Sequence, residues 1–268
     1  MRIIRFLDAH GQIHFGVPDG NGQAQLVTGD VSGPYALTQR RLEIAKLLAP
    51  VQPTAILCIG LNYRKHAAET NAKIPDFPVL FLKNPAAVQN PGDPVELPRH
   101  LASHQVDYEC ELAIVIGRRA KNVSAARAID YVSGFTAAND VSARDWQRQW
   151  GGSQWCRGKT FDTFCPLGPV LVTPDEIGDP NNLNLQTRVN GQTLQKSNTS
   201  DMIFSVEKII EFLSGSTTLL PGTVILTGTP EGVGMARQPP VWLNPGDKME
   251  IEIEKIGILA NPVIEEPC

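Results

Sequence analysis

DYECELAIVIG, residues 107–117, is the stretch of this sequence that decides the fold. Its apolar second half predicts a β-strand that enters the core. Because side chains two residues apart share one face of a strand, Glu109 and Glu111 are expected to point the same way. The strand therefore takes two carboxylates toward low dielectric together.

Two like charges at that spacing need a neutralising partner. At about 5 Å and an effective dielectric near 20, their repulsion is roughly 3 kcal/mol before any cost of desolvation. A hard cation held by oxygen ligands, Mg²⁺ or Mn²⁺, would neutralise them directly. The alternative is that the two acids lie at a wet strand edge or pair with arginines, and the pair alone does not exclude it.

Further polar groups follow where they could join such a site. Asp140 ends a second strand-like run, GFTAAND, just before a helix expected to begin at Ser142, so it is either a third oxygen ligand or a helix cap. Lys159 lies in a glycine-flanked loop and, taken alone, is more simply a solvated surface lysine. The loop TGTPEGVG, residues 227–234, could cradle an anion with backbone N–H groups, although it lacks the lysine of a P-loop.

His66 and Glu69 lie three residues apart in a short helical stretch, residues 62–72. Both can face one site, where the carboxylate would hold the imidazole tautomer and raise its basicity. The stretch is bounded by Gly60 and by prolines, and few apolar side chains would anchor it. It is therefore predicted to act as a lid. The simpler alternative is a solvated helix face.

The composition describes a mildly acidic chain. In 268 residues, 24 Lys and Arg against 28 Asp and Glu give a formal net charge of −4, so nucleic acid is not expected as a partner. No stretch is apolar enough for long enough to span a bilayer, so no membrane association is expected. Five widely spaced cysteines without a CxxC pair predict buried thiols in a reducing compartment. We expect a cytoplasmic protein.

The hydrophobic pattern favours a mainly β fold of the α+β class. Glycines and prolines, 23 and 21 in number, punctuate short β-branched runs. Strands do not alternate with long helices, which disfavours doubly wound and barrel folds. Residues 1–53 are predicted to form a small N-terminal subdomain, and residues 54–268 the larger domain.

Three helices are expected beside the short one that carries His66. One lies around residues 41–48, and a polar one covers SARDWQRQW, residues 142–150. The best amphipathic helix covers residues 202–213, with Ser200 or Asp201 as its cap.

Five ordered motifs resemble the fumarylacetoacetate hydrolase family: GLNYRKHAAE, DYECELAIVIG, GFTAANDVSARDWQ, GKTFDTFCPLGP and VILTGTPEGVG. The resemblance spans residues 55–263, and the first 53 residues resemble the small N-terminal domain of bacterial members. It implies a mixed β-sandwich roll, a catalytic domain at residues 54–268, and a homodimer that acts on a small 2-oxo acid.

The resemblance also assigns site residues. It implies that Mg²⁺ or Mn²⁺ is bound by Glu109, Glu111 and Asp140. The implied catalytic residues are His66 and Glu69, as the acid/base dyad of the lid, and Lys159. The implied substrate-binding residues are Tyr63, Arg144, Gln147 and Thr229.

Within the family, NDVSARDWQ together with GKTFDTFCPLGP is most similar to a branch associated with oxaloacetate keto-enol tautomerisation. The alternatives are carbon–carbon hydrolysis of an acylpyruvate or fumarylpyruvate, and oxaloacetate decarboxylation. All three reactions can share a metal-bound enolate. The decarboxylase and acylpyruvase branch usually has arginine at the position of Leu61, which weakens that assignment. A remoter alternative, a non-catalytic metal-binding module, would leave His66, Glu69 and Lys159 without a role.

Overall fold

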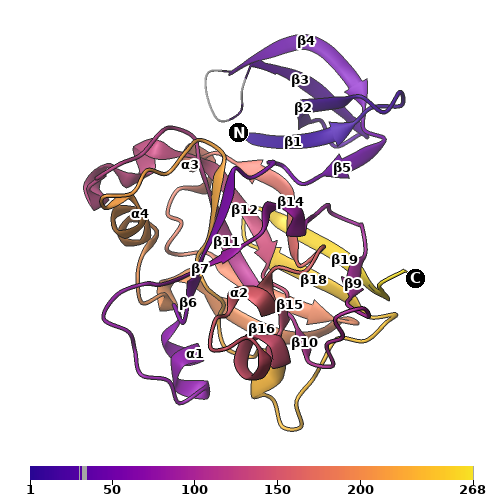
Figure 1. The fold of residues 1–268 in the computed structure, drawn as a ribbon. Helices are drawn as coiled ribbons and strands as arrows, with labels where there is room; N and C mark the ends of the chain where they lie inside the picture. The colour runs from indigo at the N-terminus through magenta and orange to yellow at the C-terminus, as the bar shows by residue number, and fades with distance from the viewer. Residues whose placement is uncertain (30, 32–34, 268) are drawn as a thin grey trace.

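The computed structural model describes residues 1–29, 31 and 35–267. In this part of the chain the strands form a sheet of twelve, a sheet of five and a two-stranded ribbon (Figure 1). Most neighbouring strands are antiparallel, but β6 with β17, β8 with β14 and β9 with β19 are parallel. The expected mainly β, mixed architecture with few helices is therefore confirmed.

The large sheet has the order β4–β3–β2–β1–β14–β12–β11–β17–β6–β7, with β5 on β1 and β8 on β14. Its strands are β1 (Arg2–Leu7), β2 (Ile13–Pro18), β3 (Gln23–Gly29), β4 (Tyr35–Glu43), β5 (Lys46–Leu48), β6 (Ala55–Gly60), β7 (Val79–Lys83), β8 (Val88–Gln89), β11 (Cys110–Ile116), β12 (Val132–Asn139), β14 (Cys165–Val172) and β17 (Thr223–Leu226). The five-stranded sheet comprises β9 (Val95–Leu97), β15 (Asn184–Val189), β16 (Gln192–Asn198), β18 (Lys248–Ile253) and β19 (Gly257–Glu265), and the ribbon β10 (Val106–Asp107) and β13 (Ser142–Ala143).

Short helices connect these strands. They are α1 (Arg64–Glu69), α2 (Cys156–Lys159), α3 (Pro174–Ile177) and α4 (Val206–Ser214), the 3₁₀ turns η1 (Pro85–Ala87), η2 (Ala125–Tyr131), η4 (Thr199–Asp201) and η5 (Gly234–Ala236), and the π-helical turn η3 (Trp146–Trp150).

Strand β11 lies at the centre of the molecule, and every one of its residues is buried. Leu112 and Ile114 pack in one apolar core, whereas Ala113 and Val115 pack in a second core on the opposite face. A strand covered on both faces needs a continuous apolar run rather than an alternating one, which explains the LAIVI sequence.

Strand β11 pairs antiparallel with β12, with Glu111 opposite Ala138. This register carries the chain on to Asp140, whose backbone N–H donates to the carbonyl of Glu109 at 2.9 Å. The ends of two central strands thus bring three acidic residues to one place.

The N-terminal strands form one end of the large sheet, and β1 joins them to the rest by pairing with β14. The helix expected around residues 41–48 is wrong, because this segment forms the end of β4 and all of β5. Leu42 pairs with Ala24 and Leu48 pairs with Arg5. The apolar side chains of this segment are compatible with a helix or a strand. The pairing with neighbouring strands buries them and decides the structure, so tertiary contacts override local propensity. The division at residue 53 stays a prediction.

Two other helix boundaries differ from expectation. After Asp140 the chain continues as β13, where Ser142 pairs with Asp107, and helical geometry begins only at Arg144. Helix α4 is capped by Ser205, whose hydroxyl accepts from the N–H of Lys208, rather than by Ser200 or Asp201, which lie in η4. The preceding turn is held to the rest of the protein by Asn62, so the helix starts later than its apolar pattern predicts.

Three cysteines, Cys58, Cys110 and Cys165, are buried free thiols, and Cys156 is half-buried; Cys268 lies outside the described residues. Within the described ranges, no helix combines the length and the apolar character that crossing a membrane requires.

Candidate metal centre and active site

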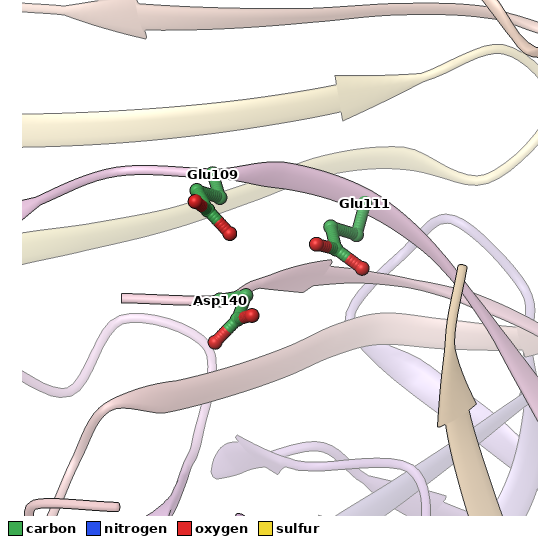
Figure 2. A group of neighbouring side chains, drawn as sticks. All are labelled: Glu109, Glu111 and Asp140. Carbon is green, nitrogen blue, oxygen red and sulfur yellow. The ribbon is translucent and has the colours of Figure 1, made fainter. Parts of the chain in front are cut away.

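The three predicted ligands, Glu109, Glu111 and Asp140, converge on one point (Figure 2). One carboxylate oxygen from each lies within 4.8 Å of the others, and each residue is at most 5 % exposed. Asp140 aims its carboxylate into this cluster rather than capping a helix, because no helix begins at Ser142. Three oxygen donors of this kind are the ligands that a hard divalent cation prefers.

Lys159 is buried against the same carboxylates. Its Nζ donates to Glu109 Oε2 and to Asp140 Oδ2, both at 2.7 Å, and the residue is 1 % exposed. The alternative of a solvated surface lysine is therefore excluded, and Lys159 lies at the end of α2 rather than in a loop.

A second buried lysine, Lys83, was not predicted from the sequence. Its Nζ donates to Asp140 Oδ1 at 2.5 Å and to the carbonyl of Val141 at 3.1 Å. In β7 the leucines at 80 and 82 are exposed, while Phe81 and Lys83 are buried. The run VLFLK is apolar up to its last residue, and Lys83 lies on the same inward face as Phe81, so no alternation of polar and apolar residues identified it.

Arg144 is held by carboxylates on two sides. Its Nη2 lies 2.8 Å from Asp107 Oδ2 and 2.7 Å from Glu109 Oε1, and its Nη1 donates to Gln147 Oε1 at 3.0 Å. Asp107 is fully buried and also accepts from the backbone N–H groups of Gly234 and Met235. Asp107 thus fixes both the guanidinium and the loop beside it.

The pKa values of the two glutamates move in opposite directions. Burial opposes ionisation of Glu109, but the positive charges of Lys159 and Arg144 outweigh it and lower the pKa to about 2. Burial raises the pKa of Glu111 well above its usual range, and the negative charges of Asp140 and Glu109 raise it further. Glu111 accepts from the N–H of Gly228 at 2.7 Å.

No lysine or arginine among the described residues forms an ion pair with Glu111. Its ionised form leaves a buried negative charge beside two other carboxylates, which the protein's own cations neutralise only in part. A divalent cation would supply the missing charge, so the donor set fits such an ion.

The dyad predicted on α1 is formed. His66 Nδ1 lies 2.7 Å from Glu69 Oε1, and Glu69 also accepts from the N–H of Gly232 at 2.9 Å. His66 is only 8 % exposed, so the solvated-face alternative is wrong for His66, whereas Glu69 is exposed. Polar contacts hold α1 in this position, because Arg64 donates to the carbonyl of Asp201 and Glu69 accepts from the N–H of Gly232 in the glycine loop. Motion of α1 as a lid stays a prediction.

The backbone N–H groups of the glycine-rich loop, residues 227–234, bind anionic groups as expected, but these groups are carboxylates of the protein itself. Its glycine N–H groups bind Glu111, Glu69 and Asp107. Glycine is required at Gly234, where an added Cβ would lie 2.0 Å from a backbone oxygen.

A cavity of about 230 Å³ opens onto this cluster. The predicted site residues that line it are His66, Glu109, Glu111, Arg144, Gln147, Lys159 and Thr229. Tyr63 is not among them: it is fully buried in the apolar core, and no partner of its hydroxyl lies among the described residues. Its position before α1 in the sequence did not reveal that it would be buried in the core instead of lining the cavity.

A model of the fumarylacetoacetate hydrolase C-terminal domain matches residues 55–264, and an Rv2993c-like N-terminal model matches residues 1–50. The chain belongs to the fumarylacetoacetate hydrolase family, and it is an enzyme.

Relatives and solved structures show which members of the family this chain is similar to. The chain is 43% identical over 290 residues to "Oxaloacetate tautomerase Fahd2a, mitochondrial" of Rattus norvegicus, covering 98% of this chain and 92% of the relative. It is 44% identical over 291 residues to "Oxaloacetate tautomerase FAHD2A, mitochondrial" of Homo sapiens, with the same coverage. A solved 5-carboxymethyl-2-hydroxymuconate delta-isomerase from Mycobacterium smegmatis superposes with a TM-score of 0.87 at 41% identity, covering 99% of this chain and 100% of that one.

These relatives correct one expectation from the sequence. The rat and human proteins, together with those of Xenopus laevis and Bos taurus, are all named mitochondrial. The cytoplasmic location is therefore wrong. It rested on the lack of a long apolar segment and on a cysteine pattern, and both suit any reducing compartment.

Lys83 offers a test of the charge balance. Lys83→Met should lower the free energy of unfolding by about 3 kcal/mol, because it removes a buried partner of Asp140. Saturating Mg²⁺ should restore part of this loss by supplying positive charge to the folded state. Urea unfolding with and without Mg²⁺ measures both effects.

Lys46→Met is the matched control, since Lys46 pairs with Asp93 at 2.7 Å but is 44 % exposed. It should cost less than about 1 kcal/mol. Equal losses in the two variants would show that Lys83 contributes no more than a surface pair.

Proposed function

We propose that this enzyme is a divalent-metal-dependent oxaloacetate keto-enol tautomerase. The observation that carries the proposal is the buried carboxylate triad with Lys159 and Arg144 beside it, at one end of a cavity sized for a small acid. The names of the rat and human relatives support the choice of oxaloacetate.

Glu109, Glu111 and Asp140 would hold Mg²⁺ or Mn²⁺. When bound there, the ion would supply Lewis-acid polarisation of the 2-oxo group and a template for the substrate. The chain's own cations complete the site, since Lys159 places a positive charge where the substrate oxygen gains negative charge.

The dyad is proposed to move the proton at C3. Because Nδ1 of His66 faces Glu69 Oε1, a proton on Nδ1 leaves Nε2 free to accept one from the substrate. Glu69 fixes this tautomer and is itself held by Gly232. Arg144, Gln147 and Thr229 are proposed to orient the substrate from the cavity wall.

Carbon–carbon hydrolysis and decarboxylation are the alternatives, because both can begin from the same bound acid. A solved relative titled fumarylacetoacetate hydrolase from Exiguobacterium antarcticum is 35% identical with a TM-score of 0.84, so the fold serves hydrolases as well. Leu61 lines the cavity and gives it an apolar wall at the position where the decarboxylase branch usually has arginine. This favours tautomerisation.

A homodimer is also proposed, formed through an apolar shelf made of Phe77, Leu80, Leu82 and Phe212. These side chains are 41–69 % exposed, and the two phenylalanine rings stack at 6.2 Å. Strand β7 is the last strand on this side of the large sheet. An edge strand with apolar side chains can pair with its own copy about a two-fold axis.

The metal and the reaction can be tested together. Glu109→Gln should abolish Mg²⁺-dependent loss of enol-oxaloacetate, because the ion loses one of its three anionic ligands. Glu43→Gln, the same change on the exposed end of β4, should not. Enol absorbance, acid release and carbon dioxide release are followed separately. Carbon dioxide or acid formed as fast as the enol is lost, or full activity in chelator, would overturn the proposal.

The dyad gives a second prediction. His66→Ala should reduce turnover roughly a hundredfold, the usual effect of losing an acid/base group. Binding of oxalate with Mg²⁺, measured by calorimetry, should persist, as it should in the exposed control His100→Ala. Wild-type rates in His66→Ala would make Lys159 the first candidate for the acid/base.

The dimer is tested by mass in solution. Light scattering should give twice the 29.2 kDa chain mass, and Leu80→Lys should give monomers because it places a charge on the shelf. Ile13→Lys, a similar change at an exposed position of β2, should leave the dimer intact. A wild-type monomer, or a dimeric Leu80→Lys, contradicts this surface.

A further inference from the structure

The cavity carries positive charge at two depths. Arg144 and Lys159 lie at its inner end and are 4 % and 1 % exposed. Arg148 also lines the cavity, but it is exposed to solvent. The proposed function uses the inner pair and gives Arg148 no role.

Helical geometry explains why Arg148 reaches the same cavity. Residues 144–150 are helical, and η3 begins at Trp146. Positions three and four apart lie on one face of a helix, so Arg144, Gln147 and Arg148 all face the cavity. Arg148 lies about one turn, roughly 6 Å, along the axis from Arg144.

The two arginines differ in what they bind. The guanidinium of Arg144 is already shared between Asp107, Glu109 and Gln147. The contact of Arg148 within the described part of the chain is with Met235 Sδ at 3.5 Å, and a thioether sulfur is only a weak acceptor. Arg148 therefore presents to the cavity a charged donor group that pairs with no carboxylate among the described residues.

Apolar side chains line the cavity together with Arg148. Trp155, Met235 and Leu61 are among them, and Met235 contacts Arg148. An apolar wall with one convergent cation is suited to orienting a second anionic group of a ligand. Such a group must lie a few bonds from the end that reaches the carboxylate triad.

We infer that Arg148 selects dicarboxylic 2-oxo acids by binding the carboxylate distal to the 2-oxo group. The inference rests on the proposed function for the orientation of the substrate, with its 2-oxo end at the triad. In oxaloacetate the two carboxyl carbons are three carbon–carbon bonds apart, so the distal one can extend toward the mouth of the cavity. A monocarboxylic 2-oxo acid leaves Arg148 unused.

The experiment uses a pair of unreactive ligands. Malate and 2-hydroxybutyrate share a 2-hydroxy acid end and a four-carbon chain, and they differ in a distal carboxylate against a methyl group. Calorimetric titration of the full chain with Mg²⁺ should show malate binding more tightly. Arg148→Gln should reduce this preference about five- to tenfold, the effect expected for one partly exposed charge-assisted contact. Arg148→Lys should restore part of it.

Arg40→Gln, which removes an exposed charge on β4, is the matched control and should leave both affinities unchanged. Loss of both affinities equally in Arg148→Gln, or an undiminished preference for malate, would overturn the inference. The assay involves no turnover, so it separates two failures. If the preference for malate depends on Arg148 but the protein has no tautomerase activity, the proposed function is wrong and the role of Arg148 stands. Tautomerase activity with no such dependence refutes the role of Arg148 alone.

Discussion

The structure depends on how four buried carboxylates and three buried cations neutralise one another at and beside the ends of β11 and β12. Lys159 bridges Glu109 and Asp140, Lys83 holds the other oxygen of Asp140, and Arg144 joins Glu109 to Asp107. Each charge is costly to bury alone and tolerable only when it is paired. Glu111 is the carboxylate that has no ion pair with a lysine or arginine among the described residues, and its pKa is raised by burial and by its acidic neighbours. A divalent cation would complete the balance, and the same positive charge would activate a 2-oxo acid.

The surrounding elements act to keep that cluster in register. The antiparallel pairing of β11 with β12 sets Glu109 beside Asp140, while backbone N–H groups of the glycine loop orient Glu111, Glu69 and Asp107. The loop therefore links the proposed metal ligands, the dyad on α1 and Arg144, which lines the cavity. Strands carry the proposed metal ligands and a short helix carries the proposed acid/base pair, as expected if α1 is the element that moves when substrate binds.

Much of this could be predicted from local sequence. The apolar run after Glu111 identifies a central strand, and two-residue spacing places its glutamates on one face. The sequence could not reveal the roles of Lys83 and Asp107, because each role depends on which face of a strand turns inward. Residues 41–48 were misassigned since Leu42 and Leu48 suit a helix or a strand until their partners are known. Tyr63 shows the same limit, because its place in a motif indicates which segment it belongs to but not whether its side chain lines the cavity.

The most direct measurement is a crystal structure grown with Mn²⁺ and oxalate, with the ion located by its anomalous scattering. The account predicts one ion within roughly 2.0–2.3 Å of oxygens from Glu109, Glu111 and Asp140. Lys159 should then turn from its bridge between Glu109 and Asp140 toward the oxalate. An ion bound elsewhere, with Lys159 still bridging those two carboxylates, would contradict the claim that the triad is the metal centre of this enzyme.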